Sequence, residues 1–146
     1  MLKKLLFVFT SIIFVSFYAN AQDVKEEITL KGGKENPLPY SKAIKYDDLI
    51  FVSGQIGLNS QGQLQEGIEA QTKQALDNLI KILEAAKSDM SKVVKVNIYV
   101  TDINDFEVVN KIYATYFSKP YPARTFIQVA KIPKNALIEI EATAHK

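Results

Sequence analysis

The sequence predicts an α+β fold in which two helices pack on one face of a β-sheet. Residues 66–87 place apolar side chains at the three- and four-residue spacing of a buried helix face. Residues 93–100 and 136–142 instead alternate between apolar and polar side chains, as half-buried strands do. The chain therefore runs strands, helix, strand, helix, strands, and a single sheet covered on one side is the economical packing of that order.

The first segment is predicted to be a secretory signal peptide, residues 1–21. Lys3 and Lys4 form a positive start, residues 5–18 carry no charge, and Ala19 and Ala21 are small residues at the positions that a signal peptidase reads. An uncleaved membrane anchor is the alternative, but the apolar run is shorter than the ~20 residues that a spanning helix needs. We therefore predict an exported protein, secreted or periplasmic, that leaves the membrane after cleavage.

Charge and cysteine content narrow the classes of function. Cleavage after Ala21 would leave 125 of the 146 residues and remove two lysines from the 18 basic side chains, so that 16 basic residues balance 16 acidic ones. A neutral mature chain argues against nucleic-acid binding through a clustered basic surface. The chain has no cysteine, so packing or oligomerisation must hold an exported domain of this size together without disulfides.

The part before the first helix is expected to hold short strands and loops. Residues 22–36 form an N-terminal segment with a short strand at 28–31, and the domain proper is placed at residues 37–146. Residues 49–54 are apolar and rich in strand-forming residues, which favours a strand buried on both faces. Gly54, Gly57 and Gly62 mark the polar loop that follows.

The elements from residue 93 onward are predicted from alternation and capping signals. In the strand 93–100, the valines Val94, Val96 and Val100 are expected to share one face with Ile98. Asn104 is interpreted as the N-cap of the second helix, with Glu107 completing a capping box. Ile103 and Val108 are predicted to form the hydrophobic pair that flanks this capping box. The positions expected to be buried in the second helix, which ends at about Phe117, are Phe106, Val109, Tyr113 and Tyr116 or Phe117.

The last quarter of the chain is predicted to be two strands, 124–130 and 136–142, joined by a tight connection at 132–135. Arg124 is the only arginine, and it follows Pro122, which cannot continue a helix. A guanidinium at a strand start is a rigid fork for a carboxylate. We predict that Arg124 and Glu139 meet at one small-molecule site, and that apolar residues on the uncovered sheet face form an oligomer interface.

The residue inventory excludes several kinds of chemistry. His145, next to the end of the chain, is the only histidine, and cysteine is absent. Thiol catalysis, a Ser-His-Asp triad and the usual zinc sites therefore lack their residues. Gly54 and Gly57 match neither common phosphate-loop spacing. An enzyme of this sequence must work with carboxylates, Arg, Lys, hydroxyls, backbone dipoles and water.

Eight short motifs, taken together, resemble the RidA/YjgF family of reactive-intermediate deaminases, also called the endoribonuclease L-PSP family. They run in the family's order and spacing from about residue 37 to residue 143. The motifs are YSKAI at 40–44, VSGQI at 52–56, EAQT at 69–72, QALDNL at 74–79, NDF at 104–106, VN at 109–110, PAR at 122–124 and IEIEA at 138–142.

The resemblance implies a chorismate-mutase-like fold with a mixed β-sheet, a homotrimer that assembles as a barrel, and a site in each cleft between subunits. It also implies hydrolysis of short-lived enamines and imines, such as 2-aminoacrylate, to 2-keto acids and ammonia, with no cofactor and no metal. By position, Arg124 matches the arginine that grips the substrate carboxylate and Glu139 the acid that holds the attacking water. Further matches are Tyr40, Ser53 and Asn110, which line the pocket, and Gly54 and Phe126, which lend backbone groups.

Some residues depart from the family pattern, and other interpretations stay open. Leu38 and Pro39 stand where the family usually has Gly-Pro, and Phe126 is bulky where smaller residues often occur. Arg124 is alternatively a surface ion-pair residue, and Glu139 a solvated strand residue like its neighbour Glu141. A non-catalytic module that binds small carboxylates is the alternative function. A ribonuclease is the weakest, because the mature chain is neutral and has a single histidine.

Overall fold

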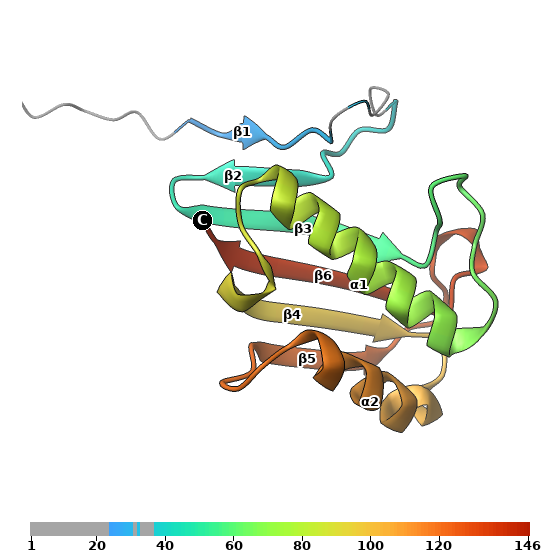
Figure 1. Cartoon of the computed structure of the whole chain (residues 1–146). Helices are drawn as coiled ribbons and strands as arrows, with labels where there is room; N and C mark the ends of the chain where they lie inside the picture. Colours follow the sequence, from blue (N-terminus) through green and yellow to red (C-terminus); the bar gives the residue numbers. More distant parts are fainter. Residues whose placement is uncertain (1–23, 31, 33–36) are drawn as a thin grey trace, which may run out of the picture.

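The computed structural model describes residues 24–30, 32 and 37–146, and it confirms the predicted α+β class. Figure 1 shows one sheet with both helices on the same face, α1 over its central strands and α2 beside the β5 edge. The elements are β1 (Glu26–Glu27), β2 (Ala43–Tyr46), β3 (Leu49–Ile56), α1 (Gly67–Ala85), β4 (Val93–Val100), α2 (Phe106–Tyr116), β5 (Ala123–Gln128) and β6 (Ile138–His145). The predicted signal peptide lies outside the described residues, and no helix among those described is long and apolar enough to cross a membrane.

The six strands follow the order β1-β2-β3-β6-β4-β5. The β4–β5 pair is parallel and the other pairs are antiparallel, so the sheet is mixed. A parallel pair needs a crossover connection, which α2 supplies here. The expectation that the two C-terminal strands form a joined pair is wrong, because β6 inserts between β3 and β4 while β5 takes the outer edge.

The alternation predicted for β6 is confirmed and defines the two faces of the sheet. Ile138 and Ile140 are fully buried under the helices, whereas Glu139 and Glu141 point to the opposite face. Leu76, Leu79 and Leu83 of α1, all fully buried, cover this core. The helix α1 itself lies within two residues of its predicted limits.

The outer face of β3 is uncovered, which corrects the prediction of a strand buried on both faces. Ile50 and Val52 are 0% and 4% exposed, but Leu49 and Phe51 on the other face are 39% and 45% exposed. Since one layer of helices covers one side of the sheet, the second side of this strand faces solvent in a single chain. Its apolar side chains fit the predicted oligomer interface.

Two strand details differ from the sequence prediction. Val94 is 52% exposed while Val93 is 6% exposed, because an irregularity between Val93 and Lys95 shifts the alternation at the start of β4. The first strand pairs at Glu26–Glu27 and not at residues 28–30, and residue 31 of the predicted strand lies outside the described residues. Ile28 is nevertheless buried, and its backbone N–H donates to the Ala43 carbonyl at 3.0 Å.

The predicted capping box at Asn104 is wrong. Asp102 is the cap, since its side chain accepts a hydrogen bond from the Asn104 backbone N–H at 2.9 Å and begins a 3₁₀ turn at Ile103–Asp105. The helix α2 then starts at Phe106. Of the positions expected to be buried, Val109, Tyr113 and Phe117 are buried, whereas Phe106 is 38% exposed.

Candidate functional site

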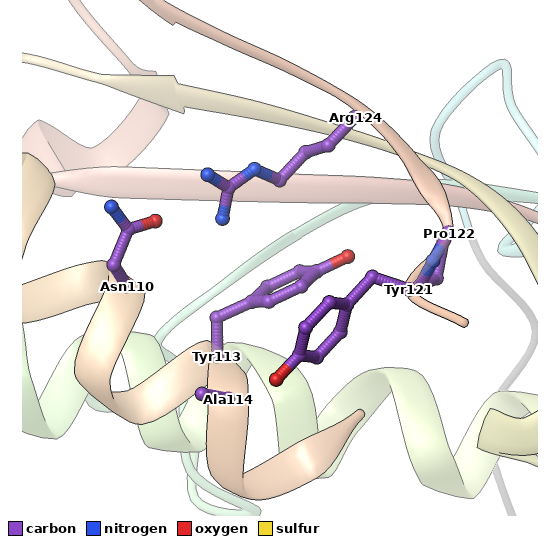
Figure 2. A pocket seen from close by; sticks show the side chains of 6 residues that line it. All are labelled: Asn110, Tyr113, Ala114, Tyr121, Pro122 and Arg124. Carbon is purple, nitrogen blue, oxygen red and sulfur yellow. The ribbon is translucent and has the colours of Figure 1, made fainter. Parts of the chain in front are cut away.

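The arginine pocket is a cavity of about 400 Å³ between α2 and the start of β5. It is lined by Asn110, Tyr113, Ala114, Tyr121, Pro122 and Arg124. Figure 2 shows the Arg124 guanidinium lying above the Tyr113 ring, with the Asn110 amide beside it. Two of the predicted site residues, Arg124 and Asn110, therefore share one pocket.

Arg124 lies on the face of β5 that the helices cover, so its side chain points toward α2. Arg124 is in register with Val96, whose side chain is buried under the helices, so the guanidinium emerges on the same side. Its carbon Cζ lies 4.7 Å from the centre of the Tyr113 ring. Within the described chain no carboxylate pairs with Arg124, so the interpretation of this residue as a surface ion-pair partner is not supported there.

Phe126 lies next to the arginine pocket and not in its lining. Its ring meets that of Phe106 edge-on, with ring centres 4.9 Å apart, and the Arg124 guanidinium is 5.8 Å from the ring centre. The bulky side chain thus forms part of the aromatic surroundings of Arg124. The role predicted for the Phe126 backbone stays a prediction.

The glutamate pocket, a groove of about 830 Å³, lies where β3 ends and β6 begins. Four of the predicted site residues line it: Tyr40, Ser53, Gly54 and Glu139. The Ser53 hydroxyl donates to the Ser41 carbonyl at 2.7 Å, which fixes the side chain and leaves the oxygen lone pairs as acceptors. Tyr40 is 54% exposed at the rim.

Gly54 makes room for the Glu139 carboxyl group. The pairing of β3 with β6 is irregular between Val52 and Gln55, which places Gly54 directly against the Glu139 side chain. A Cβ at position 54 would overlap the carboxyl oxygen Oε1. The sequence motif singled out Gly54 for its backbone, and the structure adds that the absent side chain leaves space for the acid.

Glu139 and Glu141 occupy different environments on the same face of β6. Burial, and secondarily the charge of Glu141, raise the pKa of Glu139. The Glu141 carboxylate instead accepts hydrogen bonds from the Asn97 amide at 2.6 Å and the Tyr99 hydroxyl at 3.0 Å. Glu139 accepts none from the residues that the structure describes, so its oxygens remain available to water.

A single chain does not bring Arg124 and Glu139 together. Arg124 is in register with Val96, and Glu139 with Tyr99, and these two positions of β4 point to opposite faces. The predicted residues fall into two sets, one around the arginine pocket and one in the glutamate pocket. A shared site between copies stays a prediction, and it requires the two faces of different copies to meet.

The sequence reasoning missed residues of both pockets. Tyr113 was assigned only to the core, although it stands three positions after Asn110 and so shares its helix face. That spacing was a usable signal. Lys42 and Lys134, which line the glutamate pocket, carried no such signal because exposed lysines are common. No cluster of three metal-binding side chains occurs in the described part of the chain.

Known proteins match almost the whole domain. A family model described as Endoribonuclease L-PSP matches residues 34–146. The chain is 50% identical over 108 residues to human 2-iminobutanoate/2-iminopropanoate deaminase, covering 73% of this chain and 79% of the relative. It is 46% identical over 134 residues to Reactive Intermediate Deaminase A, chloroplastic, of Arabidopsis thaliana, covering 90% of this chain and 72% of the relative.

Solved structures of the same kind superpose on the chain. RidA from the Antarctic bacterium Psychrobacter sp. PAMC 21119 is 36% identical with a TM-score of 0.78, over 83% of this chain and 99% of that one. E. coli TdcF, solved with bound serine, is 31% identical with a TM-score of 0.77, over 84% of this chain and 99% of that one. The mixed sheet with two helices is therefore the architecture of these relatives as well.

Proposed function

This chain belongs to the RidA/YjgF family, whose model carries the description Endoribonuclease L-PSP, and from that membership we propose that it hydrolyses reactive enamines and imines of the 2-aminoacrylate kind. The products are a 2-keto acid and ammonia. The names of relatives that are 46–50% identical support an imine deaminase. The observation that supports the assignment to these residues is their division between two pockets, one lined by Arg124 and one lined by Glu139.

The complete site is proposed to form between copies of the chain in a homotrimer. The Arg124 pocket of one copy would face the Glu139 pocket of the next. The exposed Leu49 and Phe51 on the uncovered sheet face supply an apolar surface for such packing. A trimer, whose sheets together form a barrel, is the assembly that the family resemblance implies.

Arg124 is proposed to bind the substrate carboxylate through two parallel N–H···O bonds. Its position on a strand with aromatic rings around it supports this role, because these rings take up none of its N–H donors. The serine bound to E. coli TdcF is also a small molecule with a carboxylate. Asn110, beside the guanidinium, supplies an amide for the same ligand.

Glu139 is proposed to position and deprotonate the attacking water. As the water oxygen bonds to the iminium carbon, Glu139 takes one water proton and the C=N electron pair moves to nitrogen. The carboxylic acid then returns this proton to the amino nitrogen of the tetrahedral intermediate, the C–N bond breaks and ammonia leaves. The remaining hydroxyl proton passes to ammonia as the keto group forms, so no oxidation state changes. The pKa of Glu139, raised by burial, suits a group that takes and returns a proton during the reaction.

The test compares wild type with Arg124→Ala in hydrolysis of 2-iminopropanoate, made in the assay by an amino-acid oxidase acting on alanine and trapped with semicarbazide. We expect wild type to lower the yield of trapped imine and Arg124→Ala to lose this effect, because a charge-assisted bond of ~1.5–3 kcal/mol disappears. Lys111→Ala, an exposed cation on α2 outside both pockets, is the matched control and should behave as wild type.

Equal activity of Arg124→Ala and wild type would contradict the proposal. Tight binding of 2-keto acids in calorimetry without any acceleration would instead favour the non-catalytic binding module. RNA cleavage that survives purification but is lost in Arg124→Ala would favour a ribonuclease.

Export is proposed for the same protein, with cleavage after Ala21. The mass of the mature chain recovered from a periplasmic extract should correspond to a first residue of Gln22. Recovery of the uncut chain from the membrane fraction would instead favour an uncleaved membrane anchor at residues 1–21. Light scattering on the same sample should give three times the mass of the mature chain, and a monomer would contradict the proposed site.

A further inference from the structure

Three aromatic rings surround the Arg124 guanidinium on the helix face of the sheet. Its carbon Cζ is 4.7 Å from the centre of the Tyr113 ring and 5.8 Å from those of Phe106 and Phe126. A cation over an aromatic face is attracted to the ring quadrupole without using an N–H donor. Because no described residue accepts a hydrogen bond from this guanidinium, the rings are what fix its direction.

Tyr113 is the nearest and most deeply buried of the three rings. It is 5% exposed, whereas Phe106 is 38% exposed. Its ring stacks on Phe117, with centres 4.3 Å apart and planes inclined by 29°, and Phe117 is itself 5% exposed. Figure 2 shows the Tyr113 ring directly below the guanidinium. A side chain held on one side by the core thus presents its other side to the cation.

The hydroxyl group of Tyr113 does not explain its position. This oxygen is buried and has no hydrogen-bond partner among the described residues. Burial raises the pKa of Tyr113 to about 12, although the nearby Arg124 charge acts in the opposite direction. The ring is therefore neutral at physiological pH, and its attraction to Arg124 is a cation–π contact and not an ion pair with a tyrosinate.

We propose that Tyr113 is a positioning residue whose ring holds the Arg124 guanidinium over the arginine pocket, so that its N–H donors stay free for the paired hydrogen bonds to the carboxylate of the substrate. This inference rests on the proposed function, because it concerns the proposed carboxylate clamp. A salt bridge to a protein carboxylate would hold the arginine equally well but would compete with the substrate. The rings of Phe106, Tyr113 and Phe126, together called the aromatic shelf, hold it without that competition.

The expected kinetic effect falls on KM. An arginine that must be ordered by the substrate itself binds the substrate more weakly in the ground state and in the transition state alike. Loss of one partly desolvated cation–π contact should raise KM about tenfold. The value of kcat should change less than about threefold, since the proposed catalytic residue Glu139 lies on another strand, β6.

The experiment compares three variants of the full chain for kcat and KM with 2-iminopropanoate, for pyruvate affinity by calorimetry, and for thermal stability. Tyr113→Leu removes the ring and should raise KM and the pyruvate Kd about tenfold. Tyr113→Phe keeps the ring, removes the unpaired hydroxyl, and should stay within about twofold of wild type in KM with an equal or higher Tm. Tyr116→Leu is the matched control and should leave KM near that of wild type, because it removes a ring of the same helix that packs on the core but lines neither pocket and makes no ring contact with Arg124.

An unchanged KM and pyruvate Kd in Tyr113→Leu would overturn the inference. An equal loss in Tyr113→Phe would assign the effect to the hydroxyl, and an equal loss in Tyr116→Leu to general packing, and both results also overturn it. If Tyr113→Leu does not fold, Phe106→Leu, which removes a half-exposed ring of the same shelf, should still weaken pyruvate binding about twofold to threefold. No weakening there counts against the proposal.

The pyruvate measurement separates this inference from the proposed function. A wild-type chain that binds pyruvate in a Tyr113-dependent way but hydrolyses no imine would contradict the deaminase and support the role of Tyr113. A wild-type chain that binds no 2-keto acid would overturn both.

Discussion

Two neighbouring carboxylates on one face of β6 have different surroundings, although the sequence presents them as equivalent. Glu141 is held by Asn97 and Tyr99, while Glu139 lies against Gly54 without a hydrogen bond from the described residues. Burial and the charge of Glu141 raise the pKa of Glu139. This residue is therefore less stable as an anion than an ordinary glutamate, which is the property expected of a group that exchanges a proton during a reaction.

Replacing Glu139 with Gln should separate activity from stability. Removal of the general base should lower kcat by about 10²–10⁴-fold. The raised folded-state pKa means that the native chain binds this proton more tightly than the unfolded chain, so the contribution of Glu139 to stability falls as pH rises from the ordinary glutamate pKa of 4.5 through the folded pKa.

Glu139→Gln has no such group, so its Tm should exceed that of wild type at neutral pH and converge with it below pH 4.5. Thermal unfolding across this pH range measures the difference, with Glu141→Gln as the comparison. Because Glu141 is hydrogen-bonded, its loss should lower stability at neutral pH. A Glu139→Gln variant with wild-type kcat would contradict the catalytic role.

At the scale of single elements, local irregularities position the site residues. The irregular pairing of β3 with β6 brings Gly54 against Glu139. The sequence predicted the strands themselves from their alternation, because burial of one face imposes a two-residue period. It did not predict this irregularity or the shift at Val94, since such features depend on contacts between strands that are distant in the chain.

Gly54→Ala should lower activity while leaving the fold intact. The new Cβ overlaps the far end of the flexible Glu139 side chain, so the carboxyl group moves and the sheet does not. A displacement of about 1 Å in a catalytic group can cost about a hundredfold in rate, and we expect a fall in kcat of that order. Kinetics together with circular dichroism measure both properties. Unchanged kcat in a folded variant would show that the position of Glu139 is unimportant.

The start of α2 offers a test of the revised capping assignment. Asp102→Ala removes the side chain that accepts from the Asn104 backbone N–H, and should lower the free energy of unfolding by ~1 kcal/mol. Asn104→Ala should cost less than half of that, because its own side chain caps no helix. Urea unfolding of the two variants compares them directly. A larger loss of unfolding free energy in Asn104→Ala than in Asp102→Ala would favour the capping box predicted for Asn104 and Glu107.

For the whole molecule, the sequence predicted the fold class, and it singled out residues that line two pockets, but it did not predict how these pockets are arranged. The arginine pocket is lined by Arg124 and Asn110, and the glutamate pocket by Ser53 and Glu139. Alternation within each strand indicates which residues share a face of that strand. Strand order decides which strands are neighbours, and the central place of β6 is not encoded in any local pattern. The division of these residues between two pockets on opposite faces therefore became visible only in the folded chain.

Complementation between inactive variants tests whether the halves meet in different copies. Arg124→Ala and Glu139→Gln should each be inactive alone. Unfolded together and refolded at equal concentration, they should regain about a quarter of wild-type activity, because random assembly pairs an intact arginine with an intact glutamate in that share of the sites. Mixing without refolding is the control. No recovery in assembled mixtures would mean that both groups act from the same chain.

The opposite orientation of Arg124 and Glu139 has a consequence for when the protein can work. If the two groups act together only across a boundary between copies, a newly folded single chain is inactive. Turnover then begins only when it associates with other copies. Dilution would then switch off the chemistry before it disturbs the fold of any individual copy.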